Sequence, residues 1–408
     1  MTHRAQLEDL FRTAVETVGG RAAVRHALER DPVPGPVALV AVGKAADSMV
    51  RGAMDVLGDQ LDSGLVISKH GHLSEACQAD PRLRCLEASH PVPDASTLVA
   101  GQSLLDYLAA LPAGRQLLVL VSGGASSLVD VLPDGYGVEH LTELNQWLLG
   151  RHLDIGRMNA IRRAVSCIKG GRLALRLGSR RTRLLLISDV PGDDPAVIGS
   201  GLLVPAPARP DLPEGVPGWV RQAAAHVPAA PSADHPSFAT ITRHIVASNG
   251  QARDAVVRRA QQLELPVVHH RELLTGDALM AGERIAEAVI HGPAGVQLWG
   301  GETTVALPEN PGRGGRAQAL ALRAAMAMEG HHGLWLLAAG TDGTDGPGED
   351  AGALVDTETC FRGRQSGLDP DTCLEAADSG SFLDASGDLL RTGPTGTNVM
   401  DLLISLKI

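Results

Sequence analysis

Glycine, arginine, threonine and acidic residues are concentrated between residues 298 and 352, where each polar group follows a short apolar run. A carboxylate, Glu302, ends the first run, and Arg313 and Arg316 flank a glycine pair at the start of a helical pattern. Asp342 follows the next apolar run. Glycine N–H groups and guanidinium groups bind phosphate, and carboxylate oxygens hold Mg²⁺. These residue types favour phosphate chemistry.

A lysine and a serine–glycine loop follow two earlier apolar runs. Lys44 stands at the expected start of a helix, where the helix dipole disfavours a cation unless both hold an anion. A loop with N–H groups free to converge on an oxyanion follows residues 117–121 and contains Ser122, Gly123, Gly124 and Ser126. The alternatives are a solvated lysine and an ordinary strand-to-helix turn.

Three further polar residues also follow or interrupt apolar patterns. Asp189 comes directly after residues 184–187, where a carboxylate can hold Mg²⁺ or act as a general base. Lys169 precedes two glycines in a cationic stretch that could equally be a solvated helix face. Asn249 follows the short run that ends at residue 247. We treat Lys169 and Asn249 as candidate substrate-binding or phosphate-binding residues.

The composition narrows the class of protein. A net charge of −11 without a dense basic block argues against nucleic acid as the main partner. It leaves room for a small-molecule substrate, even an anionic one, because local Arg and Lys residues decide that. Five scattered cysteines fit reduced thiols in a cytoplasmic protein, and no apolar run is long enough to suggest a membrane span. Aromatic residues are only 2%, so the cores must consist of aliphatic side chains. Neither of the two standard glycine-rich nucleotide-binding motifs, G-x-x-x-x-G-K-[ST] and G-x-G-x-x-G, is present.

The elements that must position these residues alternate between strands and helices. Helical patterns cover 5–30, 44–58 and 316–329, and a helix after 250 extends through 264. Strands are expected at 37–42, 117–121, 184–187, 245–247, 296–299 and 334–339. This alternation predicts an α/β protein with parallel sheets, whose ligands bind at the carboxyl ends of the strands.

A proline-rich stretch at 204–237 suggests the division between two domains, with about one helical turn near Trp219. We therefore expect an amino-terminal domain at 1–237, a smaller carboxy-terminal α/β domain at 238–408, and a cleft between them. Whether the molecule is a monomer or a homodimer stays open.

Many ordered motifs resemble the glycerate 2-kinase family, the one with a carboxy-terminal MOFRL domain that is also labelled hydroxypyruvate reductase. The matching segments cover nearly the whole chain and lie at 42–46, 90–94, 122–126, 168–173, 188–193, 300–304, 312–316, 339–346 and 392–398. The resemblance implies a Rossmann-like parallel-sheet amino-terminal domain and ATP- and Mg²⁺-dependent phosphorylation of the 2-hydroxyl of D-glycerate, which gives 2-phosphoglycerate.

The resemblance also implies roles for individual residues. Lys44 would match the family's active-site lysine, and Arg316, with Arg313 as second choice, its arginine partner. Asp189 or Asp342 would hold Mg²⁺ or accept the hydroxyl proton, with Glu302 as a further metal ligand. The residues at 122–126 would cradle substrate or phosphate.

Three departures from the family pattern put the exact substrate in doubt. Ala317 replaces an asparagine, Leu202 interrupts a Ser-Gly-Pro-Thr pattern, and Leu279 replaces an arginine. The alternatives are therefore a kinase for a related small hydroxy acid, an NAD(P)H-dependent hydroxypyruvate reductase, and a ligand-binding relative without turnover.

Overall fold

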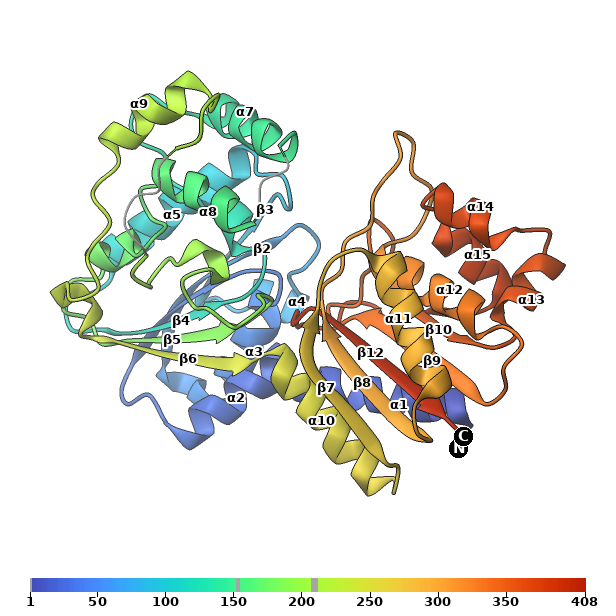
Figure 1. Cartoon of the computed structure of the whole chain (residues 1–408). Coiled ribbons are helices and arrows are strands. Elements are labelled where there is room, and N and C mark those ends of the chain that lie inside the picture. Colours follow the sequence, from blue (N-terminus) through green and yellow to red (C-terminus); the bar gives the residue numbers. More distant parts are fainter. Residues whose placement is uncertain (1, 152–154, 207–211) are drawn as a thin grey trace. The chain divides into compact units, whose positions relative to one another are not determined.

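The computed structural model describes residues 2–151, 155–206 and 212–408 and divides into two compact units (Figure 1). The N-terminal unit contains residues 20–246, and the C-terminal unit contains residues 1–19 together with 247–408. This division differs from the expected ranges of 1–237 and 238–408. The first helix belongs to the C-terminal unit, where Arg259 donates a hydrogen bond to Asp9 at 2.7 Å.

A six-stranded sheet organises the N-terminal unit. Its elements are α2 (Gly20–Arg30), β1 (Val37–Val42), α3 (Ala46–Leu57), β2 (Leu61–Lys69), α4 (Glu75–Gln78), β3 (Leu83–Ala88), α5 (Ala95–Ala110), β4 (Gln116–Val121), α6 (Ala125–Leu128), α7 (Val138–Leu149), α8 (Ile155–Val165), β5 (Thr182–Ile187), α9 (Gly218–His226) and β6 (Ile241–Ala247). The strand order is β3-β2-β1-β4-β5-β6, and β1 pairs in parallel with both β2 and β4. The order reverses between β1 and β4, where open α/β sheets bind ligands.

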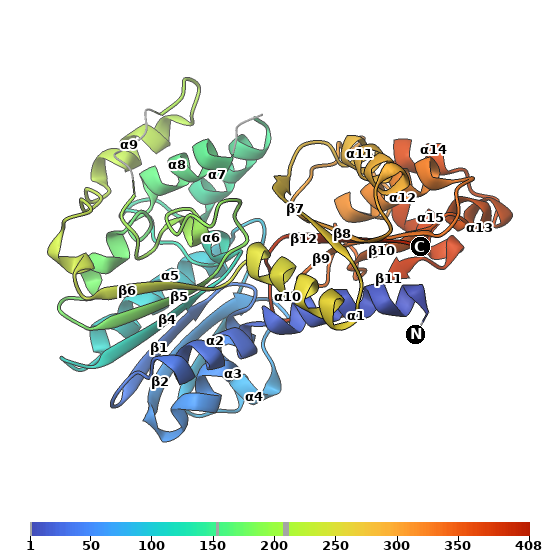
Figure 2. The ribbon, with the colours of Figure 1, turned by 60° about the horizontal axis from the view of Figure 1, so that its bottom comes forward.

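Aliphatic side chains fill this unit, as the low aromatic content predicts. All six residues of β1 are buried, which is typical of a parallel strand covered on both faces. Helices α2 and α3 cover one face of the sheet, and α5 and α8 lie on the other (Figure 2). A second cluster of buried residues joins α7, α8 and α9 above that face, with Leu144, Ile161 and Val220 at its centre.

The C-terminal unit contains a second six-stranded sheet. Its elements are α1 (His3–Thr17), α10 (Asn249–Gln262), β7 (Val267–Leu274), α11 (Ala278–His291), β8 (Gly295–Gly301), α12 (Arg316–Met328), β9 (Leu334–Gly340), β10 (Gly352–Asp356), α13 (Thr359–Gln365), α14 (Pro370–Glu375), α15 (Ser379–Ser386), β11 (Leu389–Leu390) and β12 (Asp401–Lys407). Helices α1 and α10 cover one face of the sheet, while α11 and α12 cover the other (Figure 2).

The expectation of parallel strands is wrong for this second sheet, which is mixed. Its order is β11-β10-β9-β12-β8-β7, and β12 lies antiparallel between β8 and β9. Since both neighbours run opposite to β12, they run in the same direction as each other. The carboxyl ends of β8 and β9 therefore still meet at one edge, beside the start of β12.

Two local expectations also need correction. The pattern at 5–30 forms two helices, because the first ends at Thr17 and Gly19 separates it from the second. The proline-rich stretch contains a nine-residue helix, α9, although only a turn was expected, and residues 207–211 of that stretch lie outside the described part of the chain. Within the described residues, every helix is too short or too polar to cross a bilayer.

Candidate active site

Lys44 and the serine–glycine loop meet at the point where the strand order reverses. The Lys44 backbone N–H donates to the carbonyl of Gly123 at 2.9 Å, and the N–H of Ala45 donates to Ser122 Oγ at 3.0 Å. Gly43 allows this approach, because its φ is +138° and a Cβ there would lie 2.1 Å from Ser122 Oγ. The structure thus joins the two predicted phosphate-binding segments.

His90 borders the same loop. A Cβ added to Gly124, whose φ is +82°, would lie 3.0 Å from His90 Nε2 and 3.2 Å from Lys44 Cγ. Gly124 therefore leaves the space in which an imidazole and a lysine side chain approach each other. Sequence reasoning included His90 in a family segment but gave it no role.

Asp189 and Ser126 lie on adjacent parts of this edge. Asp189 follows β5, whose neighbour in the sheet is β4, so its backbone is at the carboxyl edge as predicted. Asp193, four residues later, has a left-handed backbone with a φ of +54°. Ser126 Oγ lies 2.7 Å from Ser200 Oγ, so the two hydroxyls share a hydrogen bond.

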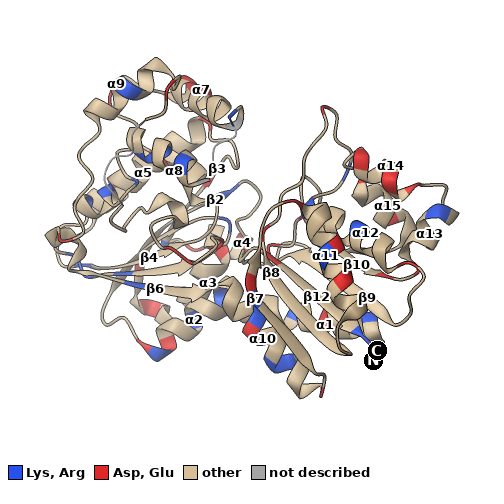
Figure 3. Cartoon of the chain, in the orientation of Figure 1, with Lys and Arg blue, Asp and Glu red and all other residues tan. Residues whose placement is uncertain are grey.

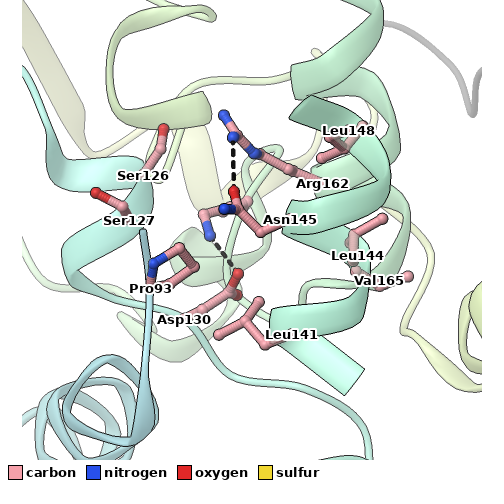
Figure 4. A pocket seen from close by; sticks show the side chains of 11 residues that line it. Pro93, Ser126, Ser127, Asp130, Leu141, Leu144, Asn145, Leu148, Arg162 and Val165 are labelled. Carbon is pink, nitrogen blue, oxygen red and sulfur yellow. Dashed lines mark hydrogen bonds and ion pairs between the residues drawn. The ribbon is translucent and has the colours of Figure 1, made fainter. Parts of the chain in front are cut away.

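Lys169 is buried and forms an ion pair with Asp130, to which Ser166 Oγ also donates at 2.6 Å. Desolvation lowers the pKa of Lys169, and the charge of Asp130 opposes that change. The carboxylate neutralises the ammonium group, and the substrate-binding or phosphate-binding role of Lys169 stays a prediction. The pair lines a pocket that Ser126 and Arg162 also border (Figure 4).

Acidic and basic residues are mixed along both units (Figure 3), so any anion site must depend on local groups. In the C-terminal unit, Arg316 begins α12 and forms a two-pronged ion pair with Asp401, through Nε at 2.7 Å and Nη2 at 2.9 Å. Its Nη1 lies 2.8 Å from Glu302 Oε1. Asp401 starts β12 opposite Gly301 and Gly340, so three strand ends converge on this arginine.

Burial by itself would lower the pKa of Arg316, but the hydrogen bond and charge of Asp401 outweigh it and raise that pKa. Burial raises the pKa of Asp401, and Arg316 opposes the change. Arg316 is therefore firmly charged and held in place by a buried carboxylate that sequence reasoning missed. The sequence feature that could have indicated Asp401 is its position as an acidic residue at the start of the last apolar run.

Asp345 caps the same helix, because it accepts hydrogen bonds from the N–H groups of Ala317 at 3.1 Å and Gln318 at 2.8 Å. Burial raises the pKa of Asp345 to about 7, helped by the charge of Asp401 and opposed by the two N–H donors. Asp342, the predicted metal ligand, is half-buried and accepts from Thr344 N at 3.0 Å.

The raised pKa of Asp345 predicts a pH-dependent stability. Between about pH 4 and pH 7 the folded protein keeps a proton that the unfolded chain releases, so this group's stabilising contribution is lost as the pH rises. Asp345→Asn removes the titration. Chemical denaturation in the presence of a chelator should show wild type losing stability relative to this variant from pH 5 to pH 8. A constant difference across that range would contradict the shift.

Arg313 and Asn249 have structural partners. Arg313 pairs with Asp350 at 2.6 Å and Asp384 at 2.9 Å, and its pKa is raised by those hydrogen bonds. The Asn249 amide is buried and donates to the carbonyls of Val399 at 2.9 Å and Asp401 at 3.0 Å. Asn249 thus ties α10 to β12, and its substrate-binding role stays a prediction.

The three predicted metal ligands come from both units. Glu302 and Asp342 follow β8 and β9 at one edge of the C-terminal sheet, whereas Asp189 belongs to the N-terminal unit. Within the described residues, no three His, Cys, Asp or Glu side chains form a group that could hold a metal. A metal shared with a phosphate-bearing substrate stays a prediction.

Two of the three departures from the family pattern lie in cores. Ala317 packs in the cluster that joins α11, α12 and the second sheet, and Leu202 packs against the first sheet. Leu279 is half-buried near the start of α11. Ala317 and Leu202 therefore contribute to packing, and only Leu279 lies partly exposed to solvent.

Two family models match the chain. Residues 6–212 match a domain of unknown function, DUF4147, and residues 295–401 match the MOFRL family. A D-glycerate 2-kinase from Thermotoga maritima is 35% identical, over 98% of this chain and 97% of that protein. An Agrobacterium vitis protein with the provisional name hydroxypyruvate reductase is also 35% identical, over 98% of this chain and 93% of its own length.

A solved structure agrees with these matches. The crystal structure of a glycerate kinase from Thermotoga maritima superimposes with a TM-score of 0.87, at 32% sequence identity, over 99% of both chains. A glycerate 2-kinase from Pyrococcus horikoshii is 32% identical over 92% of this chain and 88% of that protein.

Proposed function

The chain belongs to the glycerate 2-kinase family, and from that premise we propose that it transfers the γ-phosphoryl group of ATP to the 2-hydroxyl of D-glycerate. Relatives over nearly the full length carry the names D-glycerate 2-kinase and glycerate kinase. The observation that carries the proposal is the meeting of Lys44 with the 122–124 loop at the strand-order reversal. Backbone N–H groups and a lysine are suited to holding a phosphoryl group or a carboxylate.

The reaction needs positioning and charge neutralisation more than covalent chemistry. The 2-hydroxyl oxygen forms a bond to the γ-phosphorus, the bond to the β,γ-bridging oxygen breaks, and ADP leaves. We assign to Lys44 and Arg316 the stabilisation of negative charge on the phosphoryl oxygens or the glycerate carboxylate. Asp189 is our candidate for accepting the hydroxyl proton.

Carboxylates suit the Mg²⁺ that such a reaction uses. Glu302 and Asp342 stand at one sheet edge with the buried Asp345 and Asp401, and carboxylate oxygens are ligands that Mg²⁺ prefers. We propose that Glu302 and Asp342 would hold Mg²⁺ there, or Asp189 in the other unit. The ion would neutralise charge on the nucleotide phosphates.

A panel of small hydroxy acids with ATP and Mg²⁺, assayed by ADP release, tests the proposal. We expect D-glycerate to give the highest kcat/KM. Turnover of a different hydroxy acid in preference to glycerate would move the assignment to a related substrate, and no ADP release from any acid would contradict kinase activity.

A second candidate function is an NAD(P)H-dependent hydroxypyruvate reductase, which is suggested by the name of one relative and by the strand order. The order found here is also that of dinucleotide-binding folds. The first turn, however, contains Gly43 and Lys44 where such folds have a glycine fingerprint. Oxidation of NADH or NADPH with hydroxypyruvate would support the reductase, and we expect none.

Gly124→Ala is expected to reduce turnover at least about tenfold, because its methyl group would occupy the space between His90 and Lys44. The left-handed backbone adds a destabilisation of roughly 1–2 kcal/mol. Gly135→Ala is the matched control, since Gly135 has a similar φ of +89° but nothing within 4 Å of the added Cβ. Equal turnover in the two variants would argue against a reacting group at this place.

A further inference from the structure

A pocket in the N-terminal unit lies beside the loop at 122–126, in which Gly123 and Gly124 approach Lys44. Its cavity volume is only about 20 Å³, which has room for one small group rather than for a whole ligand. Helices α7 and α8 form one wall and α6 another (Figure 4). Most of the wall is apolar, from Pro93, Leu141, Leu144, Leu148 and Val165.

The polar groups of this pocket leave one positive charge uncompensated. Two cations, Lys169 and Arg162, line it together with a single carboxylate, Asp130. Asp130 forms its ion pair with Lys169 and also accepts from Ser166 Oγ and Val131 N. Desolvation lowers the pKa of Arg162, and Asp130 acts on it only through its charge. The Arg162 side chain is thus half-buried without a carboxylate partner of its own among the described residues.

The Arg162 guanidinium group has N–H donors available for a ligand. Within the described part of the chain, its side-chain hydrogen bond is a long one, from Nη2 to Asn145 Oδ1 at 3.4 Å. A guanidinium group carries five N–H donors arranged in a fork that fits a carboxylate. In Figure 4 the Arg162 and Asn145 side chains point toward one another, with Ser126 and Ser127 across the pocket.

The pocket and Lys44 border the same two chain segments. Gly124 approaches Lys44, and Ser126, two residues later, lines the pocket. His90 approaches Gly124, and Pro93, three residues later, also lines the pocket. Two residues span at most about 7 Å of chain. The residue that approaches Lys44 and the residue that lines the pocket are therefore neighbours in one loop.

We propose that this pocket binds the carboxylate of the hydroxy-acid substrate, with Arg162 and Asn145 as its specificity-determining residues. The proposal rests on the function proposed above and assigns a position to one end of the substrate. The Lys169–Asp130 pair is a positioning element, because it is buried beneath the pocket and internally neutralised. The small size and apolar walls favour a short carboxylate over a nucleotide triphosphate.

Arg162→Gln should raise KM for D-glycerate by on the order of 30- to 100-fold, because it removes a charge-assisted hydrogen bond in a desolvated site. KM for ATP should stay at the wild-type value. Arg163→Gln is the matched control, since it removes the same charge from the next residue of α8, which does not line the pocket. Its kinetics should equal those of wild type.

Asn145→Asp tests the same site without removing the arginine. The new carboxylate would stand beside Arg162 and occupy it, so the fold should keep its thermal midpoint while KM for D-glycerate rises at least about tenfold. Wild type should prefer D-glycerate to its uncharged amide, and Asn145→Asp should lose that preference. If Arg162→Gln does not fold, the KM of Asn145→Asp for D-glycerate tests the pocket instead.

These kinetic measurements test the carboxylate-binding pocket separately from the proposed kinase function. Wild-type KM and an unchanged acid-over-amide preference in both variants would overturn the subsite while leaving the kinase intact. A raised KM for ATP alone would overturn it by assigning the pocket to a phosphate. If wild type releases no ADP with any acid, the function fails, and calorimetry of D-glycerate with the protein alone still tests the pocket. Equal binding heats for wild type and Arg162→Gln would then overturn it.

Discussion

Lys44→Ala is expected to lower the turnover of D-glycerate with ATP by on the order of 10³-fold, the effect of removing a positioned charge from a phosphoryl-transfer site. Lys44 stands half-buried where the strand order reverses, with its backbone tied to Gly123. Its side chain approaches the position of Gly124. Since the backbone contacts do not depend on the side chain, we expect the variant to fold. Steady-state ADP release and thermal unfolding test the two expectations.

Lys69→Ala is the control for that experiment. Lys69 ends β2, the strand beside β1, so the two lysines stand at the ends of neighbouring parallel strands. Turnover by Lys69→Ala should be close to wild type. If Lys44→Ala retained wild-type turnover, the reversal point of the first sheet would not be where the phosphoryl group or substrate binds.

Arg316→Gln is expected to lower the free energy of unfolding by about 3–5 kcal/mol, because it leaves the buried carboxylate of Asp401 without its partner. The Asp401 side chain is only 6% exposed and receives two hydrogen bonds from the arginine. Turnover should also fall by on the order of 10²-fold or more, if the guanidinium group stabilises transferred charge. Denaturation and ADP release report on the two effects separately.

A double variant distinguishes support of the fold from catalysis. Arg316→Gln with Asp401→Asn removes both charges of the buried pair, so most of the lost stability should return while turnover stays low. Recovery of turnover together with stability would mean that Arg316 only supports the fold. Arg323→Gln is the matched control on the same helix, because its partner Glu283 is 47% exposed and such pairs contribute less than about 1 kcal/mol.

The positions of the predicted site residues in the first unit followed from the sequence. Lys44, Ser122 and Asp189 each come directly after an apolar run, and parallel strands bring their carboxyl ends to one edge. Glu302 and Asp342 also share an edge, although the second sheet is mixed rather than parallel. That edge exists because β8 and β9 run in the same direction on either side of β12.

The residues that sequence reasoning missed depend on contacts between distant segments. Asp401 pairs with Arg316, 85 positions away, and Asp130 with Lys169, 39 positions away. No local periodicity specifies which carboxylate neutralises which cation, so the sequence does not indicate that Asp130 is the partner of Lys169. The placement of α1 in the C-terminal unit also depends on a contact between distant segments, because Arg259 and Asp9 are 250 positions apart.

The identity of the phosphorylated product tests the central claim most directly. Purified protein is incubated with D-glycerate, ATP and Mg²⁺, and the product is identified by phosphorus NMR against authentic 2-phosphoglycerate and 3-phosphoglycerate. The kinase proposed here predicts stoichiometric ADP and 2-phosphoglycerate, both lost in Lys44→Ala. Formation of 3-phosphoglycerate, or no phosphorylated acid while hydroxypyruvate oxidises NADH, would contradict it.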